Sequence, residues 1–322
     1  MRGELLAKLD ILMATYNGER FVAEQIESVR WQTFEDWRLL VLDDCSSDST
    51  KDIVRLYEQR DRRIEVVPSE DRLGGAAKSF MRLLSLSDAP YCMFCDQDDV
   101  WLDDKIAVEL EEIKRLEKRW GEGTPLVVFG DMYVVDASLE VLAESFHAYT
   151  GIDATRTTLR QLISYNVAPG CAMLLNAKAR ELALRARDFE RIFLHDWWVM
   201  LAASEFGATS NVQRPLLLYR QTGSNLMGAV KRRLTVRPIS PKERVEEELL
   251  SARQARLFLD TFEDELSPST IRMLDQYSSA YESDSFLIGL ARLAKSGCWK
   301  AGFRRKLGQV RALFFRAKGA RR

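Results

Sequence analysis

Long hydrophobic runs are missing from this 322-residue sequence. No stretch reaches the roughly 18 apolar residues that a membrane-spanning helix needs, so we expect no transmembrane helix. The first ten residues contain no apolar core of the kind found in secretory signal peptides, so no signal peptide is expected. Repeats and low-complexity segments are also absent. What remains is an ordinary globular composition, with 46% hydrophobic and 30% charged residues.

The cysteines are too few and too irregularly spaced for a disulfide framework. There are five in a long chain, an odd number, which favours a reducing compartment such as the cytoplasm. Cys92 and Cys95 have the spacing of a redox or zinc pair, but they lie in an apolar run and no second pair stands at zinc spacing. We therefore expect structural cysteines, since free Cys is usually buried.

Acidic residues are absent from the end of the chain. Residues 285–322 contain eleven Lys or Arg and no Asp or Glu, which leaves 36 basic and 48 acidic residues in the preceding part, a formal charge of −12. An acidic body with a basic end indicates a phosphate-bearing partner, either anionic lipid or nucleic acid. Nucleic acid is not expected, because no nucleic-acid-binding motif is present.

Aromatic and aliphatic residues are mixed into this basic end, among them Trp299, Phe303 and Phe314. A basic face beside an apolar face is typical of a helix that lies in a membrane interface. The alternative is a helix that packs on the rest of the protein and exposes its Lys and Arg to water. The pattern alone leaves both open.

Strand-like and helix-like segments alternate along the first hundred residues. This alternation predicts a largely parallel sheet with helices on both faces. The expected strands are 9–14, 38–42, 64–68, 91–95, 126–130, 171–175 and 215–219. The expected helices are 21–31, 49–59, 78–86, 160–166, 196–204, 242–262 and 269–294, with Pro238 and Pro241 marking a linker.

Polar clusters follow several expected strands: Thr15–Gly18 (TYNG), Asp43–Asp48 (DDCSSD) and Asp96–Asp99 (DQDD). Ligands of parallel sheets bind beyond the carboxyl ends of the strands, so these clusters are the candidate site. Three acids in four residues favour a bound Mg²⁺ or Mn²⁺, which prefer oxygen ligands. The alternative for this cluster is a solvated acidic turn. The 43–48 cluster could accept hydrogen bonds from a base or ribose or cap the next helix, and the two are compatible if Asp48 or Ser49 caps the helix while Asp43 faces the ligand.

These motifs, taken in order, resemble the family-2 glycosyltransferases of GT-A fold. The resemblance rests on residues 14–18, the Gln25, Gln32 and Thr33 spacing, 42–50, 96–101, 166–171, 195–198 and 219–225, and so spans roughly 9–228. DQDD followed by an aliphatic residue and Trp is similar to a bacterial subgroup whose members are often rhamnosyltransferases. The resemblance implies a GT-A α/β catalytic domain at 1–230, with a Rossmann-like, nucleotide-sugar-binding mixed sheet flanked by helices, and a helical, basic C-terminal region at 231–322.

The resemblance also implies roles for individual residues. A divalent metal, Mg²⁺ or Mn²⁺, would be held by Asp98 with Asp96 and Asp99. Asp196 matches the family's general base, which removes a proton from the acceptor hydroxyl so that the sugar is transferred with inversion; alternatively it caps a helix. His195 is expected to be a local hydrogen-bond partner. The donor would be bound by Thr15, Tyr16, Asn17, Asp43, Lys78, Asp96, Gln97 and Arg220.

Two positions depart from the family pattern. Thr222 stands where relatives commonly have His, which puts metal or diphosphate binding in question. Cys45 stands where they often have Gly, a milder departure that affects the geometry of the turn. The expected reaction is transfer from a nucleoside-diphosphate sugar, dTDP-rhamnose or a UDP-sugar, to a saccharide or lipid-linked acceptor in cell-surface polysaccharide synthesis. We expect a cytoplasmic enzyme at the inner face of the cell membrane. The alternatives are a nucleotidyltransferase and a catalytically impaired scaffold protein.

Overall fold

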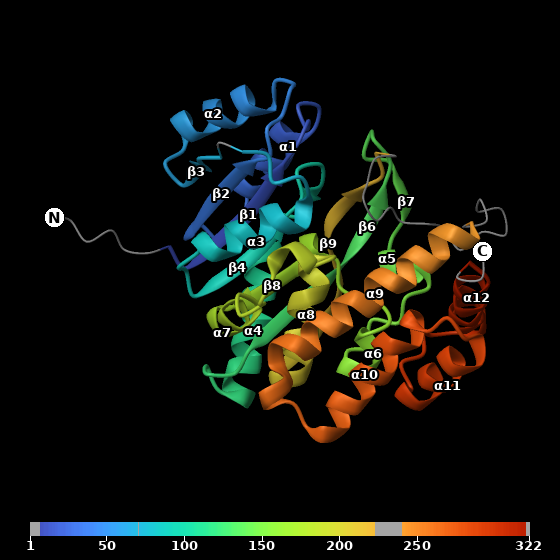
Figure 1. Ribbon diagram of the computed structural model, residues 1–322. Helices are drawn as coiled ribbons and strands as arrows, with labels where there is room; N and C mark the ends of the chain where they lie inside the picture. The colour runs from blue at the N-terminus through green and yellow to red at the C-terminus, as the bar shows by residue number, and fades with distance from the viewer. Residues whose placement is uncertain (1–6, 70, 223–239, 320–322) are drawn as a thin grey trace.

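The computed structural model describes residues 7–69, 71–222 and 240–319. Within them the chain forms one sheet with helices on both sides (Figure 1). Pro238, the 223–225 end of the last motif and the expected boundary at 230/231 lie outside the described residues. The strands are β1 Leu9–Thr15, β2 Trp37–Asp43, β3 Ile64–Val67, β4 Tyr91–Cys95, β5 Val100–Trp101, β6 Leu126–Val135, β7 Val141–Ala143, β8 Met173–Asn176 and β9 Ala208–Arg220.

Twelve α-helices occur in the described residues, and the last four form the C-terminal region on the right of Figure 1. They are α1 Val22–Arg30, α2 Thr50–Arg60, α3 Ala76–Leu86, α4 Lys105–Trp120, α5 Phe146–Thr150, α6 Leu159–Leu162, α7 Ala177–Ala183, α8 His195–Phe206, α9 Pro241–Phe262, α10 Pro268–Glu282, α11 Phe286–Ser296 and α12 Phe303–Gly319.

The sheet has the order β3-β2-β1-β4-β8-β6-β9-β5, with β7 paired to β6. The first four strands are parallel, as the alternating pattern predicts. β8 then lies antiparallel between β4 and β6, so the sheet is mixed, as the family resemblance implies, whereas the alternating pattern alone predicts a largely parallel one. The expected α/β, GT-A architecture with a helical C-terminal extension is confirmed.

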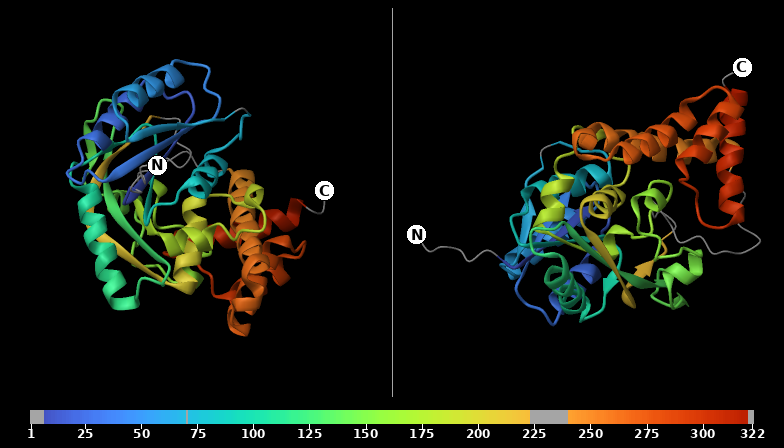
Figure 2. Two further views of the ribbon diagram at one scale, coloured as in Figure 1. Left: turned by 90° about the vertical axis from the view of Figure 1, so that its left-hand side faces the viewer. Right: turned by 90° about the horizontal axis from the view of Figure 1, so that it is seen from below.

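Two hydrophobic clusters cover the two faces of the sheet. One holds the apolar sides of α1 and α4, and the other those of α3, α8 and α9. α4 and α9 therefore lie on opposite sides of the sheet (Figure 2). Strands such as β4, in which all five residues are buried, read as continuous apolar runs because both of their faces are covered.

Several expected boundaries were wrong. α4, a 16-residue amphipathic helix, was missed, and in place of the expected helix 160–166 there is only the four-residue α6, Leu159–Leu162. The expected helix 269–294 is two helices, α10 and α11, separated by 283–285. α11 folds back against α10 so closely that a Cβ on Gly289 would lie 2.7 Å from the Ala280 carbonyl oxygen. Tertiary packing thus overrides the continuous apolar periodicity.

The C-terminal helices share a core with the helix that carries Asp196. Trp198 of α8 packs against Phe258 and Phe262 of α9, with ring centroids 5.6 and 6.0 Å apart. Aromatic contacts of this kind contribute beyond their buried area. None of the helices in the described ranges combines the length and the apolar character needed to cross a membrane.

A buried ion pair fixes the start of α4 beneath the strand β5. The Lys105 Nζ lies 2.9 Å from a Glu109 carboxylate oxygen, and both side chains are fully buried. The same ammonium group lies 5.0 Å from the Trp101 ring centroid. Burial raises the pKa of Glu109 to about 7, and the attraction of Lys105 opposes that rise.

Removing one partner of this pair is expected to cost more than removing both. Lys105→Met should lower the free energy of unfolding by about 3–5 kcal/mol, because it leaves a buried carboxyl group without its cation. Lys105→Met/Glu109→Met should recover most of that loss. Urea unfolding of the three proteins measures it.

The pH dependence gives this comparison a second readout. Because the folded state favours a protonated Glu109, its contribution to stability is lost as pH rises from the unfolded pKa of about 4.5 toward about 7 in the wild type. Without Lys105 the pKa rises further, so the deficit of the single variant should widen above about pH 7. A deficit independent of pH, or a double variant less stable than the single one, would contradict this account.

Candidate active site

Three loops meet at the carboxyl edge of the parallel strands. Thr15 and Asp43, the last residues of β1 and β2, are register partners, and Cys95 at the end of β4 is level with Met13 of β1. The loops that follow these strands therefore start side by side. The convergence expected for Thr15–Gly18, Asp43–Asp48 and Asp96–Asp99 is what the sheet produces.

Asp43 is held by its own neighbourhood. Its carboxylate accepts hydrogen bonds from the Thr15 hydroxyl at 2.9 Å and the Ser46 backbone N–H at 2.8 Å, and the Lys51 ammonium lies 3.6 Å away. The side chain is buried. Asn17 ties the same two loops together, because its side-chain oxygen accepts from the Ser47 N–H at 2.8 Å. Asp43 does not cap α2, which begins at Thr50.

Gln97 joins the first and third loops. Its amide oxygen accepts from the Tyr16 N–H at 2.9 Å, and its amide nitrogen donates to the Tyr16 carbonyl at 3.0 Å. This reciprocal pair uses both ends of the amide on protein backbone. The Tyr16 ring remains 42% exposed, with the Arg72 guanidinium 4.5 Å from its centroid. Gln97 thus positions Tyr16, whatever it also does toward a donor.

Gly18 makes room for this pair. A Cβ at Gly18 would lie 2.2 Å from the Gln97 amide oxygen. Because real Cβ atoms do not approach so closely, any larger residue must push the amide away from Tyr16.

We expect Gly18→Ala to be destabilising only while Gln97 is present. Displacing the amide loses two backbone hydrogen bonds, so the free energy of unfolding should fall by about 1–2 kcal/mol. Gln97→Ala should lose a similar amount. The double variant should be no less stable than Gln97→Ala alone, since the clash has gone. Additive losses in urea unfolding would show that the Gly18 backbone matters for another reason.

The acids after β4 form a like-charged group in which Asp96 and Asp98 are half-buried and Asp99 is buried. Asp99 is fully buried; one carboxylate oxygen accepts the Arg220 backbone N–H at 3.1 Å, and the other has no partner among the described residues. Burial, then the neighbouring Asp98 and Asp196, raise the pKa of Asp96 to about 7. Burial and the neighbouring Asp96 and Asp98 raise the pKa of Asp99 well above its usual range. A bound cation would relieve this repulsion.

Cys171 was missed as a member of this group. Single ligand-type atoms of Asp96, Asp99 and Cys171 all lie within 4.8 Å of one another. Burial raises the pKa of the Cys171 thiol well above its usual range, with Asp99 and Asp96 adding to the rise. The thiol therefore stays protonated beside the acids. The carboxylate oxygens suit Mg²⁺ or Mn²⁺, whereas a protonated thiol does not.

Asp98 lies outside that three-residue group. Burial raises the pKa of its carboxyl group, against the attraction of Arg220, and its backbone carbonyl accepts the Arg220 Nε–H at 2.8 Å. The metal role given to Asp98 stays a prediction. Cys171 ends the 166–171 segment that resembles the family, so the sequence did point to it. It was nevertheless predicted to be a structural cysteine, because free Cys is usually buried, and Cys171 is indeed buried.

Arg220, expected to face a diphosphate, is 2% exposed. Its guanidinium donates to the Asp98 and Ala137 carbonyls, each at 2.8 Å, and pairs with Glu24. It also lies 4.5 Å from the Phe21 ring centroid. These contacts tie β9 to the acidic loop. A diphosphate contact would require Arg220 to exchange some of them, and that role stays a prediction.

The loop after β3 is attached to the same edge by Asp44. The Asp44 carboxylate accepts the backbone N–H groups of Leu73 and Gly74 at 2.5 and 2.9 Å. Gly74 has a φ of 78°, a conformation that a glycine adopts without strain. The loop leads into α3, where the ammonium group of Lys78 pairs with Glu190. The phosphate role of Lys78 also stays a prediction.

Asp196 lies in the first turn of α8 and faces the acids of the β4 loop. Its carboxylate accepts the Gly170 N–H at 2.9 Å and its electrostatic influence reaches Asp96. Burial raises the pKa of Asp196 to about 6. The carboxyl group is thus mostly ionised at neutral pH and basic enough to take a proton. It is not the N-cap, a position that Leu194 occupies.

His195 does not hydrogen-bond locally as expected. Its ring stacks on Phe80 with centroids 4.1 Å apart, and neither ring nitrogen has a partner among the described residues. Burial lowers the pKa of His195 to about 3, so the ring is neutral at physiological pH. A Cβ at Gly170 would lie 2.9 Å from the His195 Nε2, which explains a glycine here.

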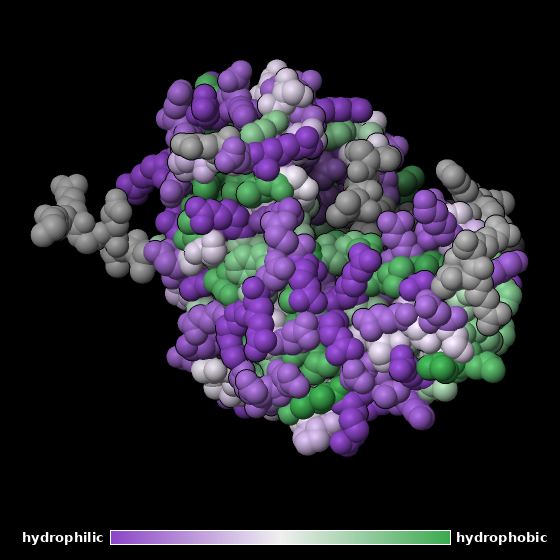
Figure 3. Space-filling model, viewed as in Figure 1, coloured by the Kyte–Doolittle hydropathy of each residue, from purple (hydrophilic) through white to green (hydrophobic). Residues whose placement is uncertain are grey.

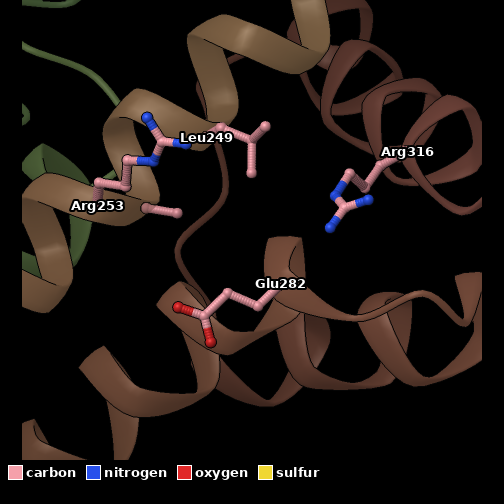
Figure 4. Close-up of a pocket in the computed structure, with 5 residues that line it drawn as sticks. Leu249, Arg253, Glu282 and Arg316 are labelled. Carbon is pink, nitrogen blue, oxygen red and sulfur yellow. The ribbon is translucent and has the colours of Figure 1, made fainter. Parts of the chain in front are cut away.

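A separate cavity of about 350 Å³ lies among the C-terminal helices (Figure 4). It is lined by Leu249, Ala252, Arg253, Glu282 and Arg316 from α9, α10 and α12. None of the candidate residues above contributes to it, so it is not part of the acidic site.

Comparison with known proteins agrees with this geometry. Residues 10–175, just over half of the chain, match the model of Glycosyl transferase family 2. Over 234 residues the chain is 28% identical to the dTDP-rhamnosyl transferase RfbG of Shigella flexneri, covering 67% of this chain and 74% of that one. Over 102 residues it is 34% identical to WfgD of Escherichia coli, a UDP-Glc:alpha-D-GlcNAc-diphosphoundecaprenol beta-1,3-glucosyltransferase, covering 32% of this chain and 39% of WfgD.

Solved structures share the fold. The crystal structure of Staphylococcus aureus TarS 1–349 superposes with a TM-score of 0.55 at 18% identity, covering 85% of this chain and 71% of that one. The mannosyltransferase PcManGT of Pyrobaculum calidifontis, in complex with GDP-Man and Mn²⁺, gives a TM-score of 0.51 at 14% identity, covering 98% and 86%. At these identities the likeness concerns the fold alone.

Proposed function

The chain belongs to glycosyl transferase family 2, and from that premise we propose that it transfers a hexose with inversion, rhamnose from dTDP-rhamnose being the first candidate. The observation that carries the proposal is the cluster formed by the half-buried Asp96 and the buried Asp99 and Asp196, beyond the end of β4 and at the start of α8. RfbG, a dTDP-rhamnosyl transferase, supports rhamnose as the sugar. UDP-sugars are the alternative donors, because WfgD uses UDP-Glc.

In this proposal Asp196 takes the proton of an acceptor hydroxyl as its oxygen attacks the anomeric carbon. The bond from that carbon to the diphosphate oxygen breaks on the opposite face, so the nucleoside diphosphate leaves with the bonding electrons. One base and one displacement invert the anomeric centre, and no covalent intermediate with the enzyme is needed. Burial suits Asp196 for this step because it brings the pKa of the carboxyl group to about 6.

Asp96 and Asp99 would hold a divalent cation, and Asp98 is the further candidate from the motif. When bound, Mg²⁺ or Mn²⁺ neutralises the charge that develops on the leaving diphosphate. The half-buried Asp96 and the buried Asp99 both have raised pKa values, and one Asp99 oxygen has no hydrogen-bond partner among the described residues; these observations support oxygen ligation at this place. The exposed ring of Tyr16 is available to stack on the nucleotide base, and Thr15 and Asp43 lie beside it on β1 and β2.

The acceptor in this proposal is a saccharide of a cell-surface polysaccharide, carried on a lipid. WfgD acts on a diphosphoundecaprenol-linked sugar, which supports a lipid carrier. We therefore place the reaction at the cytoplasmic face of the membrane, with the catalytic domain at 1–230 and the basic region at 231–322 close to the lipid. The family match favours sugar transfer over nucleotidyl transfer. A catalytically impaired scaffold remains the second candidate because of Thr222.

We expect the purified protein with Mg²⁺ or Mn²⁺ to release nucleoside diphosphate slowly from one member of a panel of dTDP- and UDP-sugars. Chelation should abolish release. Asp196→Asn should lower the rate by about 100-fold or more, since the general base is lost while the shape is kept. Asp99→Asn should raise the metal concentration needed for half-maximal release, because one proposed metal ligand loses its charge. Asp52→Asn, a change of one exposed acid on α2, is the matched control and should have no effect.

The outcomes separate the candidates. A raised metal requirement in Asp98→Asn but not in Asp99→Asn would assign the cation to the motif acid Asp98 instead of Asp99. Neither release nor nucleotide binding with any donor would reject the transferase proposal in favour of the scaffold. Nucleotide binding without release, followed by turnover when a lipid-linked acceptor is added, is the result expected of an enzyme that requires its acceptor.

A further inference from the structure

The outer face of α12 is an exposed apolar stripe. Phe303 is 80% exposed, Leu307 37% and Phe314 49%. At 100° per residue these positions fall within about 40° of one another around the helix. Side chains this apolar are seldom left in water on one stripe of a helix whose opposite side, including Gln309 and Leu313, is already packed.

Basic side chains flank this stripe. Arg304, Lys306, Arg311 and Lys318 are all exposed, and none of them forms an ion pair within the described part of the chain. The other basic side chains of α12 turn inward. Arg305 donates to the carbonyls of Thr150 and Gly151 at 2.9 and 2.8 Å.

Arg316 is the second inward-facing basic residue. It points toward α9 and α10 into the cavity of Figure 4, 3.5 Å from Asp284. The inward residues attach the helix to the protein, and the outward ones are left for a partner.

α11 extends the same surface. Leu287 is 73% exposed and Ile288 51%, and Lys295 on this helix is also exposed. The two helices are packed together through Phe286 and Phe314, with ring centroids 5.8 Å apart. In the space-filling view apolar surface gathers at the lower right, over α11 and α12 (Figure 3). We call the exposed residues Leu287, Ile288, Lys295, Phe303, Arg304, Lys306, Leu307, Arg311, Phe314 and Lys318 the basic–apolar face.

We propose that the basic–apolar face binds an anionic lipid bilayer, with α12 lying in the plane of the headgroups. An apolar stripe flanked by Lys and Arg matches the boundary between acyl chains and negatively charged headgroups. No acidic residue follows Asp284, so nothing on α11 or α12 opposes such a surface. A second copy of the chain fits less well, because two such faces in contact would bring like charges together.

The purpose of this binding rests on the proposed function, because it would bring the acidic site to a lipid-linked acceptor. The binding itself depends on no step of the reaction. The two proposals can therefore fail separately.

The test is sedimentation of the full chain with vesicles of phosphatidylcholine, with and without phosphatidylglycerol. The wild type should bind the anionic vesicles, and the binding should weaken as salt shortens the Debye length. Lys306→Gln/Arg311→Gln should weaken it by roughly thirtyfold, about fivefold for each cation. Leu287→Ser/Phe303→Ser should weaken it by about tenfold or more, because two apolar side chains no longer enter the interface. These two positions are the most exposed apolar side chains of α11 and α12, so the fold should persist.

Lys118→Gln/Arg119→Gln is the matched control. It removes two exposed charges from α4, far from α12 in Figure 1, and should bind vesicles as the wild type does. Nucleotide release measured without vesicles should be the same in all four proteins. Equal vesicle binding by the wild type and both face variants would overturn the inference. So would dimerisation of the wild type that both face variants abolish. Vesicle binding by a protein that neither binds nucleotide nor releases it from any donor would reject the proposed function and leave this inference standing.

Discussion

The structure of the site depends on holding several carboxylates together where water is largely excluded. Asp96, Asp99 and Asp196 come from the end of β4 and the start of α8, and burial raises the pKa of each. Such a group is costly to form, so neighbouring elements have to hold it in place. The buried guanidinium of Arg220 does part of this by joining β9 to the carbonyl of Asp98.

The loops around these acids are held to each other by side chains rather than by more sheet. Gln97 binds both backbone groups of Tyr16, and Asp44 binds the N–H groups that start the loop before α3. In our proposal Tyr16 contacts the donor, and its backbone is held in place by Gln97. Asp44 likewise fixes a loop and takes no part in the proposed reaction. This explains why the polar clusters are longer than three or four ligands require.

The sequence predicted the parallel half of the fold well because β1, β2 and β4 are continuous apolar runs and each ends in a polar cluster. It could not predict that β8 enters antiparallel beside β4, since no local pattern records which strand pairs with which. The same limit applies to the site. Asp96 and Asp196 could be proposed from motifs, but the proximity of Cys171 to Asp99 arises only from tertiary packing. The reciprocal pairing of Gln97 with Tyr16 spans 81 residues, so no local pattern predicts it; the donor role of Gln97 stays a prediction.

α8, the helix that carries Asp196, depends on the C-terminal helices for its burial. All nine residues from His195 to Ala203 are buried, so this helix has no side suited to water. Trp198 is covered by α9, which belongs to the basic end of the chain. A gene that lost everything after β9 would encode a protein with that tryptophan uncovered and Asp196 on an unsupported helix. The acidic site and the basic C-terminal helices therefore have to be kept in one chain, because α9 covers the helix that positions Asp196.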